Sequence, residues 1–236
     1  MTSQRSTGRT ALLAAGALLL AVVLIACGGP SGGKSASSDP ATALAAAKKN
    51  FDAAPSVQFT MSTASKPTKG DAVLGAEGTL THQPAFKGSV KALLLGITAD
   101  VPIVAVDGKV YAKLPFSSGY SVINPSEYSA PDPATFADPS AGISGLLTQL
   151  QGAKKTGQKR DGKQIVTTFA GTLPGSLVAP IIPSAKASGT YRTEVGIDGS
   201  NRIATLRVTG TFFSGAGDVT YDLTFDYGED VTITKP

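Results

Sequence analysis

Cys27 is the only cysteine in this chain of 236 residues, and its surroundings suit one covalent modification. An apolar run occupies residues 11–25, and Arg5 and Arg9 precede it. A basic start, a short apolar run and a small residue before the cleavage point are typical of a secretory signal peptide. As a helix the run would be roughly 22 Å long, which is short for crossing a bilayer. We therefore predict a signal peptide over residues 1–26 and acylation of the Cys27 thiol.

The alternative is an ordinary signal peptide that happens to contain a cysteine. We favour acylation because an unpaired thiol in an exported protein would be a liability. The lipid would anchor the mature chain to the cell membrane on its outer, periplasmic face. It would also exclude a disulfide, so apolar burial must stabilise the 210 residues that remain. That length is sufficient for one domain with its own core.

The other residues that could do chemistry do not assemble into a catalytic pattern. His82 is the only histidine and lies in a predicted turn, so it offers neither a triad nor a zinc site of a common type. Asp222 and Asp226 share one face of a predicted strand and could form an acid–base pair. The opposite face of that strand is apolar, so we expect both carboxylates to face water. We therefore predict no enzymatic activity, no metal site and no cofactor.

Charge gives little indication of a polar macromolecular partner. Of the 21 Lys and Arg residues, two belong to the predicted signal peptide, which leaves 19 against 17 acidic residues. This near balance does not indicate nucleic-acid binding. A small basic cluster follows the second predicted helix, and it consists of Lys154, Lys155, Lys159, Arg160 and Lys163. It is either a solvated loop or a segment attracted to anionic lipid headgroups.

The mature chain begins with a tether and a helix. Residues 27–39 are rich in Gly and Ser and predict a flexible tether between the acylated cysteine and the folded part. We assign residues 40–236 to a single domain. Asp39 and Pro40 suit a helix start, and Phe51 closes an apolar face that ends before a proline.

Strand patterns dominate the rest of the chain. Alternating or apolar segments predict strands over residues 57–62, 73–81, 86–91, 103–106, 110–111, 163–172, 189–197, 202–212 and 219–227. Asp107-Gly108 is a strong signal for a two-residue hairpin turn. The run Leu93 to Ile97 is too apolar for an alternating strand, and it is either a buried strand or the rim of a cavity. These patterns predict an α+β domain built on an antiparallel sheet.

Two further helices are expected to cover that sheet. One begins at Asp138-Pro139 and carries its apolar residues at helical spacing, and the other covers residues 174–182. Their apolar stripes consist of Ile143, Leu146, Leu147 and Leu150, and of Leu177, Val178 and Ile181. The Pro- and Ser-rich residues 117–137 between strands and helices predict a long loop. It is either passive or a gate.

The order of these elements resembles the actinobacterial LppX/LprG lipoprotein family. The resemblance spans essentially the whole mature chain, and it rests on order and spacing since no single element is diagnostic. The matching segments are the lipobox at Cys27, Gly88-Ser89-Val90-Lys91, Val106-Asp107-Gly108, Tyr111-Ala112, Asp132-Pro133-Ala134, Pro139, Gly142-Ile143, Leu146-Leu147, Ala153, Gly157, Asp161-Gly162 and the end from Val231 to Pro236.

The resemblance implies a strongly curved antiparallel half-barrel, with helices on its concave side that enclose a large hydrophobic cavity. The residues implied as its lining are Phe59, Met61, Phe86, Val90, Val104, Val106, Ile143, Leu146, Leu147, Leu150, Leu177, Val178 and Ile181. Core packing alone would also bury these side chains, because a filled core and a hollow one produce the same apolar pattern. Val90 is the preferred single test, since its match falls on the implied cavity wall.

The resemblance further implies a carrier of acylated lipids or glycolipids across the periplasm toward the outer envelope. Transfer into a dry cavity stabilises each methylene by about 0.8 kcal/mol, so such binding needs no catalysis. The alternative is a non-catalytic sensor or interaction lipoprotein that modulates a membrane kinase or transporter. The expected partners are therefore an acylated ligand, the membrane through the lipid anchor, and a membrane transporter.

Overall fold

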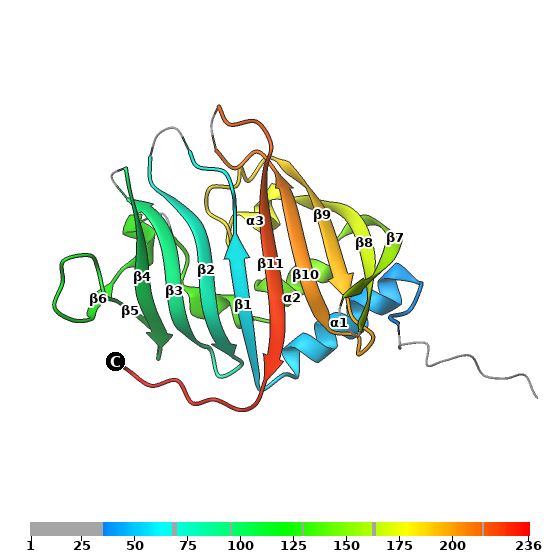
Figure 1. Cartoon of the computed structure of the whole chain (residues 1–236), viewed down its shortest axis with the longest axis horizontal. Coiled ribbons are helices and arrows are strands. Elements are labelled where there is room, and N and C mark those ends of the chain that lie inside the picture. The colour runs from blue at the N-terminus through cyan, green and yellow to red at the C-terminus, as the bar shows by residue number, and fades with distance from the viewer. Residues whose placement is uncertain (1–34, 68–69, 95, 129, 162–163, 214) are drawn as a thin grey trace, which may run out of the picture. The chain divides into compact units, whose positions relative to one another are not determined.

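Strands dominate the part of the chain that the computed structural model describes. This part comprises residues 35–67, 70–94, 96–128, 130–161, 164–213 and 215–236. Cys27, the predicted signal peptide and most of the predicted tether lie outside these residues, so they stay predictions. Figure 1 shows one broad antiparallel sheet whose helices all lie on a single side.

The sheet has eleven strands and is accompanied by five short helices within the described residues. The strands are β1 (Ser56–Ser62), β2 (Ala72–Thr81), β3 (Ala85–Leu94), β4 (Ile97–Val106), β5 (Lys109–Ala112), β6 (Ser121–Ile123), β7 (Gln151–Asp161), β8 (Gln164–Pro174), β9 (Thr190–Ile197), β10 (Ile203–Gly210) and β11 (Val219–Gly228). The α-helices are α1 (Pro40–Asp52), α2 (Ile143–Leu147) and α3 (Gly175–Val178). The 3-10 helices are η1 (Pro125–Tyr128) and η2 (Pro133–Ala137).

The sheet consists of two meanders that meet at its centre. Its strand order is β6-β5-β4-β3-β2-β1-β11-β10-β9-β8-β7, so each strand pairs with its neighbour in the chain except where β1 meets β11. At that junction Val57 lies opposite Tyr227 and Met61 opposite Leu223. We call β1–β6 the N-terminal half and β7–β11 the C-terminal half. The order is linear, so the sheet is open, as a half-barrel requires.

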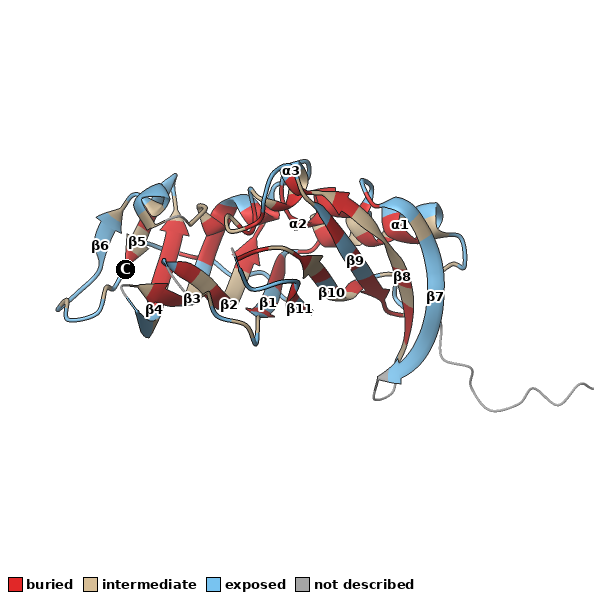
Figure 2. Cartoon of the chain, turned by 90° about the horizontal axis from the view of Figure 1, so that it is seen from above, coloured by how far each residue is buried: buried red, intermediate tan, exposed pale blue. Residues whose placement is uncertain are grey.

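The two faces of the sheet follow the alternation of the sequence. On β11 the side chains of Tyr221, Leu223 and Phe225 are buried, whereas Asp222 and Asp226 are exposed on the outer face. Asp222 accepts a hydrogen bond from Arg207 Nε at 2.6 Å. The face with the helices, called the inner face here, therefore carries the core (Figure 2). The predicted class, a curved antiparallel α+β fold with helices on one side, is confirmed.

Helix α1 forms as its sequence predicts. The Asp39 side chain accepts a hydrogen bond from the Thr42 amide at 2.8 Å, and Pro40 occupies the first turn, where no amide donor is needed. Hydrogen bonds from the Thr42 side chain and from its backbone amide lower the pKa of the Asp39 carboxyl group from the ordinary value. The helix buries Leu44, Ala47 and Phe51 against the C-terminal half.

Helix α2 is shorter than predicted and is fastened to α1 by polar contacts. It begins at Ile143 because the Asp138 carboxylate instead caps a turn, accepting the amides of Ser140 and Ala141 at 2.7 Å. Ser144, which is fully buried, donates to Asp52 Oδ1 at 2.5 Å. Lys48 pairs with the other oxygen of Asp52 at 2.7 Å. The hydrogen bond from Ser144 to Asp52 joins the two helices over the inner face, and the ion pair within α1 holds the Asp52 carboxylate in place.

Three predictions about the elements were wrong in detail. The basic cluster is not a loop: Lys154, Lys155, Lys159 and Arg160 lie on β7, while Lys163 is outside the described residues. Edge strand β7 is exposed on both sides, so it lacks the alternation that reveals a strand. The predicted loop over 117–137 contains β6, η1 and η2, and the predicted helix over 174–182 is α3 followed by turns.

Candidate functional site

An apolar cavity lies on the inner face of the N-terminal half. Its volume is about 80 Å³, and the described residues around it are almost all aliphatic, aromatic or proline. They are Met61, Ala72, Val73, Ala76, Val90, Ala92, Leu94, Val101, Ile103, Val110, Leu114, Ile123, Pro125, Tyr128, Ala130, Pro131, Pro133, Phe136, Ile181, Ile182 and Pro183. Tyr128 has the only polar side-chain group in this set. The lining therefore suits a hydrocarbon ligand and provides no acid or base.

The cavity exists because small side chains occupy the middle strands. Ala76 on β2 and Ala92 on β3 line it, where longer side chains would close the space. Gly78 and Gly88 sit opposite each other on the same two strands. A β-carbon at Gly78 would come within 2.6 Å of the Phe86 ring, so that ring already covers the glycine pair. Phe86 thus fills the space beside the cavity rather than lining it.

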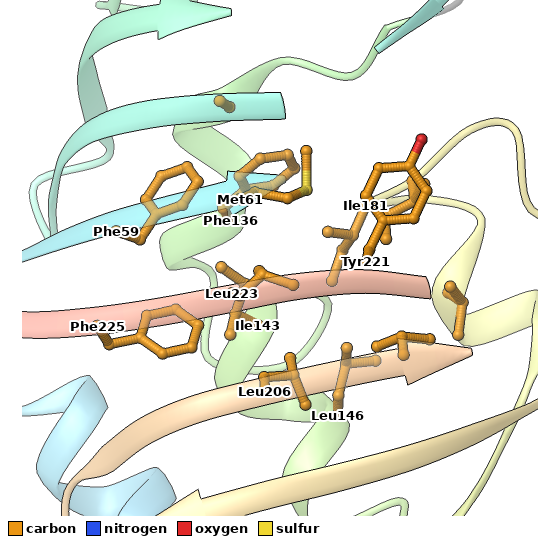
Figure 3. Close-up of a cluster of buried hydrophobic side chains, with 14 of the residues drawn as sticks. Phe59, Met61, Phe136, Ile143, Leu146, Ile181, Leu206, Tyr221, Leu223 and Phe225 are labelled. Atoms are coloured by element: carbon orange, nitrogen blue, oxygen red, sulfur yellow. The ribbon is translucent and has the colours of Figure 1, made fainter. Parts of the chain in front are cut away.

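A tight apolar cluster bounds the cavity toward the centre of the sheet. The Phe59 ring lies 5.9 Å from that of Phe86 and 6.1 Å from that of Phe136. Figure 3 shows Met61 and Phe136 next to Phe59. The apolar side chains of Leu223, Ile143 and Leu206 continue the cluster into the C-terminal half. The cavity therefore ends where the packed core begins.

The wall of the cavity opposite the sheet is formed by a segment we call the lid, residues 124–138. It supplies Pro125, Tyr128, Pro131 and Phe136 to the lining. Within the described residues, its backbone hydrogen bonds join only positions three to five apart, or a neighbour such as Gly142 that follows it. In the described part of the chain, η2 packs on β2, β3 and β4, and its side chains at the cavity, Pro133 and Phe136, are apolar. Apolar contacts are non-directional, so a ligand can replace them with similar ones.

One buried hydroxyl links the cavity wall to the centre of the sheet. Tyr221 Oη donates to the carbonyl of Val73 at 2.7 Å. This carbonyl is free because the register of β2 against β3 shifts between Val73 and Gly75. Burial raises the pKa of Tyr221 to about 12, since the phenolate would be poorly solvated there.

The structure places three of the predicted lining residues at the cavity: Met61, Val90 and Ile181. Eight more pack in the main core without lining the cavity, and they are Phe59, Phe86, Ile143, Leu146, Leu147, Leu150, Leu177 and Val178. From the apolar run Leu93 to Ile97, Leu94 at the end of β3 lines the cavity, whereas Ile97 at the start of β4 is 66% exposed, so these described residues lie at the cavity rim.

Val104 and Val106 were wrongly expected to line the cavity. They lie on the outer face of β4, where Val104 packs with Ala85 and Ile233 from the end of the chain. Their neighbours Val101 and Ile103 face the cavity instead. Successive side chains of a strand point to opposite faces of the sheet, so an error of one residue in the assignment exchanges the inner and outer faces. The pairing of Val106 with Lys109 across the Asp107-Gly108 turn could have revealed this, because it places Val110 opposite Ala105 on the inner face.

The remaining candidate groups for chemistry lie away from the cavity. His82 Nδ1 is 2.8 Å from the carbonyl oxygen of Ala54, and its ring meets Phe51 edge to face at 5.7 Å. In the described part of the chain, no three Asp, Glu, His or Cys side chains group closely enough to hold a metal ion. None of the helices in the described ranges is long and apolar enough to cross a membrane.

The fold and cavity together define a class of protein: an open antiparallel sheet that encloses an apolar space under a lid. The family described as LppX_LprAFG lipoprotein matches residues 39–233. The chain belongs to this family, and the predicted resemblance is confirmed.

Curated relatives share this family. The lipoarabinomannan carrier protein LprG of Mycobacterium tuberculosis (strain ATCC 25618 / H37Rv) is 28% identical over 162 residues, which are 67% of this chain and 66% of the relative. The protein of the same name from Mycobacterium leprae (strain TN) is 27% identical over 163 residues, with the same coverage. The chain thus spans 66% of the length of these relatives.

Two crystal structures have the same fold. LprF from Mycobacterium bovis superposes with a TM-score of 0.69 at 17% identity, covering 87% of this chain and 99% of LprF. The lipoprotein LppX of Mycobacterium tuberculosis superposes with a TM-score of 0.60 at 18% identity, covering 83% of this chain and 98% of LppX. At these identities the likeness concerns the fold alone.

Proposed function

We propose that this protein is a membrane-anchored, non-catalytic lipoprotein that binds acylated lipids or glycolipids and carries them across the periplasm toward the outer envelope. The observation that carries the proposal is the apolar cavity, whose cover is the lid with apolar side chains facing inward. Membership of a lipoprotein family supports it, as does the name of the LprG relatives, lipoarabinomannan carrier protein. The predicted acylation of Cys27 supplies the anchor.

Loading requires the lid to move. A volume of about 80 Å³ is far below the roughly 300 to 1,000 Å³ of common ligand pockets, so a long acyl chain fits only if the cavity widens. An acyl chain that enters would replace the lid's contacts with the sheet by contacts of the same kind. Each buried methylene contributes about 0.8 kcal/mol, so a long chain can offset the cost of opening.

The lining also indicates how selective binding would be. Only the Tyr128 hydroxyl could bond a polar group from among the described lining side chains. The headgroup would therefore stay at the rim or outside, and acyl chains would dominate the affinity. Release would follow when the lid closes again or when a second apolar acceptor takes the chains.

The decisive experiment is native mass spectrometry of the purified folded part with Val90→Trp. Val90 lines the cavity, and the larger indole would occupy much of it. Displacing two methylenes costs about 1.6 kcal/mol, so bound diacyl or triacyl lipid should fall more than tenfold. Ser89→Trp is the matched control, because Ser89 precedes Val90 on β3 and lines the outer face. Unchanged lipid occupancy in Val90→Trp would contradict the proposal.

One observation favours the alternative role in interaction. Phe116 is fully exposed, and Tyr120 and Val122 beside it are also exposed apolar residues on the edge formed by β5 and β6. Exposed apolar residues of this kind are typical of protein contacts. The same mass measurement separates the two roles, because an interaction module would purify without lipid and fail to take it up.

A further inference from the structure

Strand β7 presents an unusual concentration of free positive charge. Its residues Lys154, Lys155, Lys159 and Arg160 are all exposed. Among the described residues, none of the four forms an ion pair, and the adjacent strand β8 contains no acidic residue. The exposed arginines on the next strands differ, because Arg192 and Arg207 pair with aspartates at 2.8 and 2.6 Å.

The cations lie along a free sheet edge. In the described sheet β7 pairs only with β8, and its other side is open. Lys154 lies opposite Ala170 and Lys155 opposite Phe169, so consecutive cations point to opposite faces of the strand. The edge is therefore positive from both sides. Charged side chains also prevent edge-to-edge pairing of strands, and that role predicts no attraction to lipid.

The N-terminal end of the described chain places this edge near the predicted anchor. Helix α1 contacts β7, and Figures 1 and 2 show its N-terminal end beside the β7 edge of the sheet. Twelve peptide units separate Cys27 from Asp39, so the chain between them can extend at most about 40 Å. A lipid on Cys27 would thus keep the start of α1, which lies beside the β7 edge, within about 40 Å of the membrane surface.

We propose that β7 is a membrane-contact edge that binds the headgroups of anionic phospholipids. Basic side chains near a surface of negative potential are attracted to it and need no specific pocket. This inference rests on the membrane anchoring in the proposed function. It adds an orientation of the protein on the membrane: β7 would face the bilayer, and the cavity, which lies mainly on the N-terminal half of the sheet, would face away from it. Five to ten strand spacings of about 4.8 Å separate β7 from the strands β1 to β6 that line the cavity, so the cavity would lie farther along the sheet from the anchoring bilayer than β7 does.

The test measures vesicle binding of residues 35–236, which contain the complete described core and lack Cys27. Vesicles of phosphatidylcholine with phosphatidylglycerol are compared with phosphatidylcholine alone in a sedimentation assay at low salt. Lys154→Gln combined with Lys159→Gln should weaken binding to the anionic vesicles about 30-fold. Raising the salt should weaken binding of the unmodified protein in the same direction.

The matched control is Lys87→Gln combined with Lys109→Gln, which changes net charge equally at exposed positions in the N-terminal half. It should leave vesicle binding nearly unchanged. Equal loss in both double variants would overturn the proposal, because net charge alone would then explain binding. Failure of the unmodified protein to prefer anionic vesicles would overturn it as well.

Lipid occupancy measured by native mass spectrometry separates this proposal from the proposed function. The β7 variants should keep full lipid occupancy, whereas Val90→Trp should lose lipid and keep vesicle binding. Intact occupancy without vesicle binding in the unmodified protein would refute the membrane-contact edge alone. Vesicle binding by a protein that never takes up lipid would refute the carrier function alone.

Discussion

The two halves of the sheet carry similar apolar inner faces but are covered in different ways. Over the C-terminal half, α1 and α2 bury Phe51, Ile143 and Leu147 almost completely, and a partly buried hydrogen bond from Ser144 to Asp52 joins the helices. Over the N-terminal half, the cover is the lid, and small residues on β2 and β3 leave a hollow.

The comparison shows that the half covered by helices is densely packed, whereas the half covered by the lid contains a hollow. A helix satisfies its own backbone and can present a continuous row of large side chains to a sheet. The lid is rich in proline, and the backbone hydrogen bonds of its described residues are local, so under the proposed function it is the part of the cover expected to open. The same sheet thereby combines a half with a filled core and a half with a hollow, and we propose that the hollow half binds the ligand.

The strongest test of this contrast removes one buried phenylalanine from each half. Phe51→Ala should lower the free energy of unfolding by about 3 to 5 kcal/mol, because Phe51 is fully buried and its ring meets those of His82, Phe225 and Tyr227. Phe136→Ala should cost only about 1 to 2 kcal/mol, since the lid can collapse into the existing hollow. Urea unfolding measures both values. Equal losses would break the comparison.

Alkaline unfolding tests the link between the halves at Tyr221. Its pKa is about 12 in the folded state and near 10.0 in the unfolded chain, because burial disfavours the phenolate. The folded state therefore holds the phenolic proton more tightly. This contribution to the free energy of unfolding is fully present below pH 10 and is lost as the pH rises through 12. The loss should reach about 2 to 3 kcal/mol.

Tyr221→Phe is the control for this pH dependence. The variant should lose stability at neutral pH, because the Val73 carbonyl loses its donor, and should show a shallower decline between pH 10 and 12. Chemical denaturation across this range measures the slope. An identical slope in both proteins would assign the alkaline sensitivity to other groups, such as Tyr191 and Tyr227, whose pKa values burial also raises.

The smallest expected effect concerns the lid itself. Pro131→Gly should lower the free energy of unfolding by at most about 1 kcal/mol, chiefly by increasing the freedom of the unfolded chain. Amide hydrogen exchange over residues 124–138 should become faster, while exchange in α1 stays unchanged. Pro84→Gly, in the exposed turn between β2 and β3, should leave exchange in the lid as it was. Equal acceleration in α1 and the lid would show that they open as one unit.

Local patterns in the sequence predicted several elements because short-range physics determines them. The Asp39-Pro40 start of α1 needs only a side-chain acceptor and a residue without an amide donor. Asp107 and Gly108 both adopt positive φ, at 53° and 66°, as a two-residue hairpin turn requires. On β11 the alternation of Tyr221, Leu223 and Phe225 with polar residues determines the buried face.

Other features escaped prediction because distant segments create them. Val104 is buried on the outer face only because Ile233, from the far end of the chain, covers it. Strand β7 is recognisable only by its pairing with β8, since its own residues are exposed on both sides. The lid residue Phe136 lies against Phe59 although 77 positions separate them in the sequence.

The sequence by itself therefore determined the family, the antiparallel α+β class, the start of α1 and the apolar character of the inner face. Only the tertiary structure decided which apolar residues fill the core and which surround a hollow. The physical reason is that burial depends on hydrophobicity, whereas a cavity depends on how far facing side chains reach across the space between them. Ala76 and Ala92 would be equally compatible with a filled core. They line a cavity because the side chains of the lid opposite them do not reach far enough to fill the space.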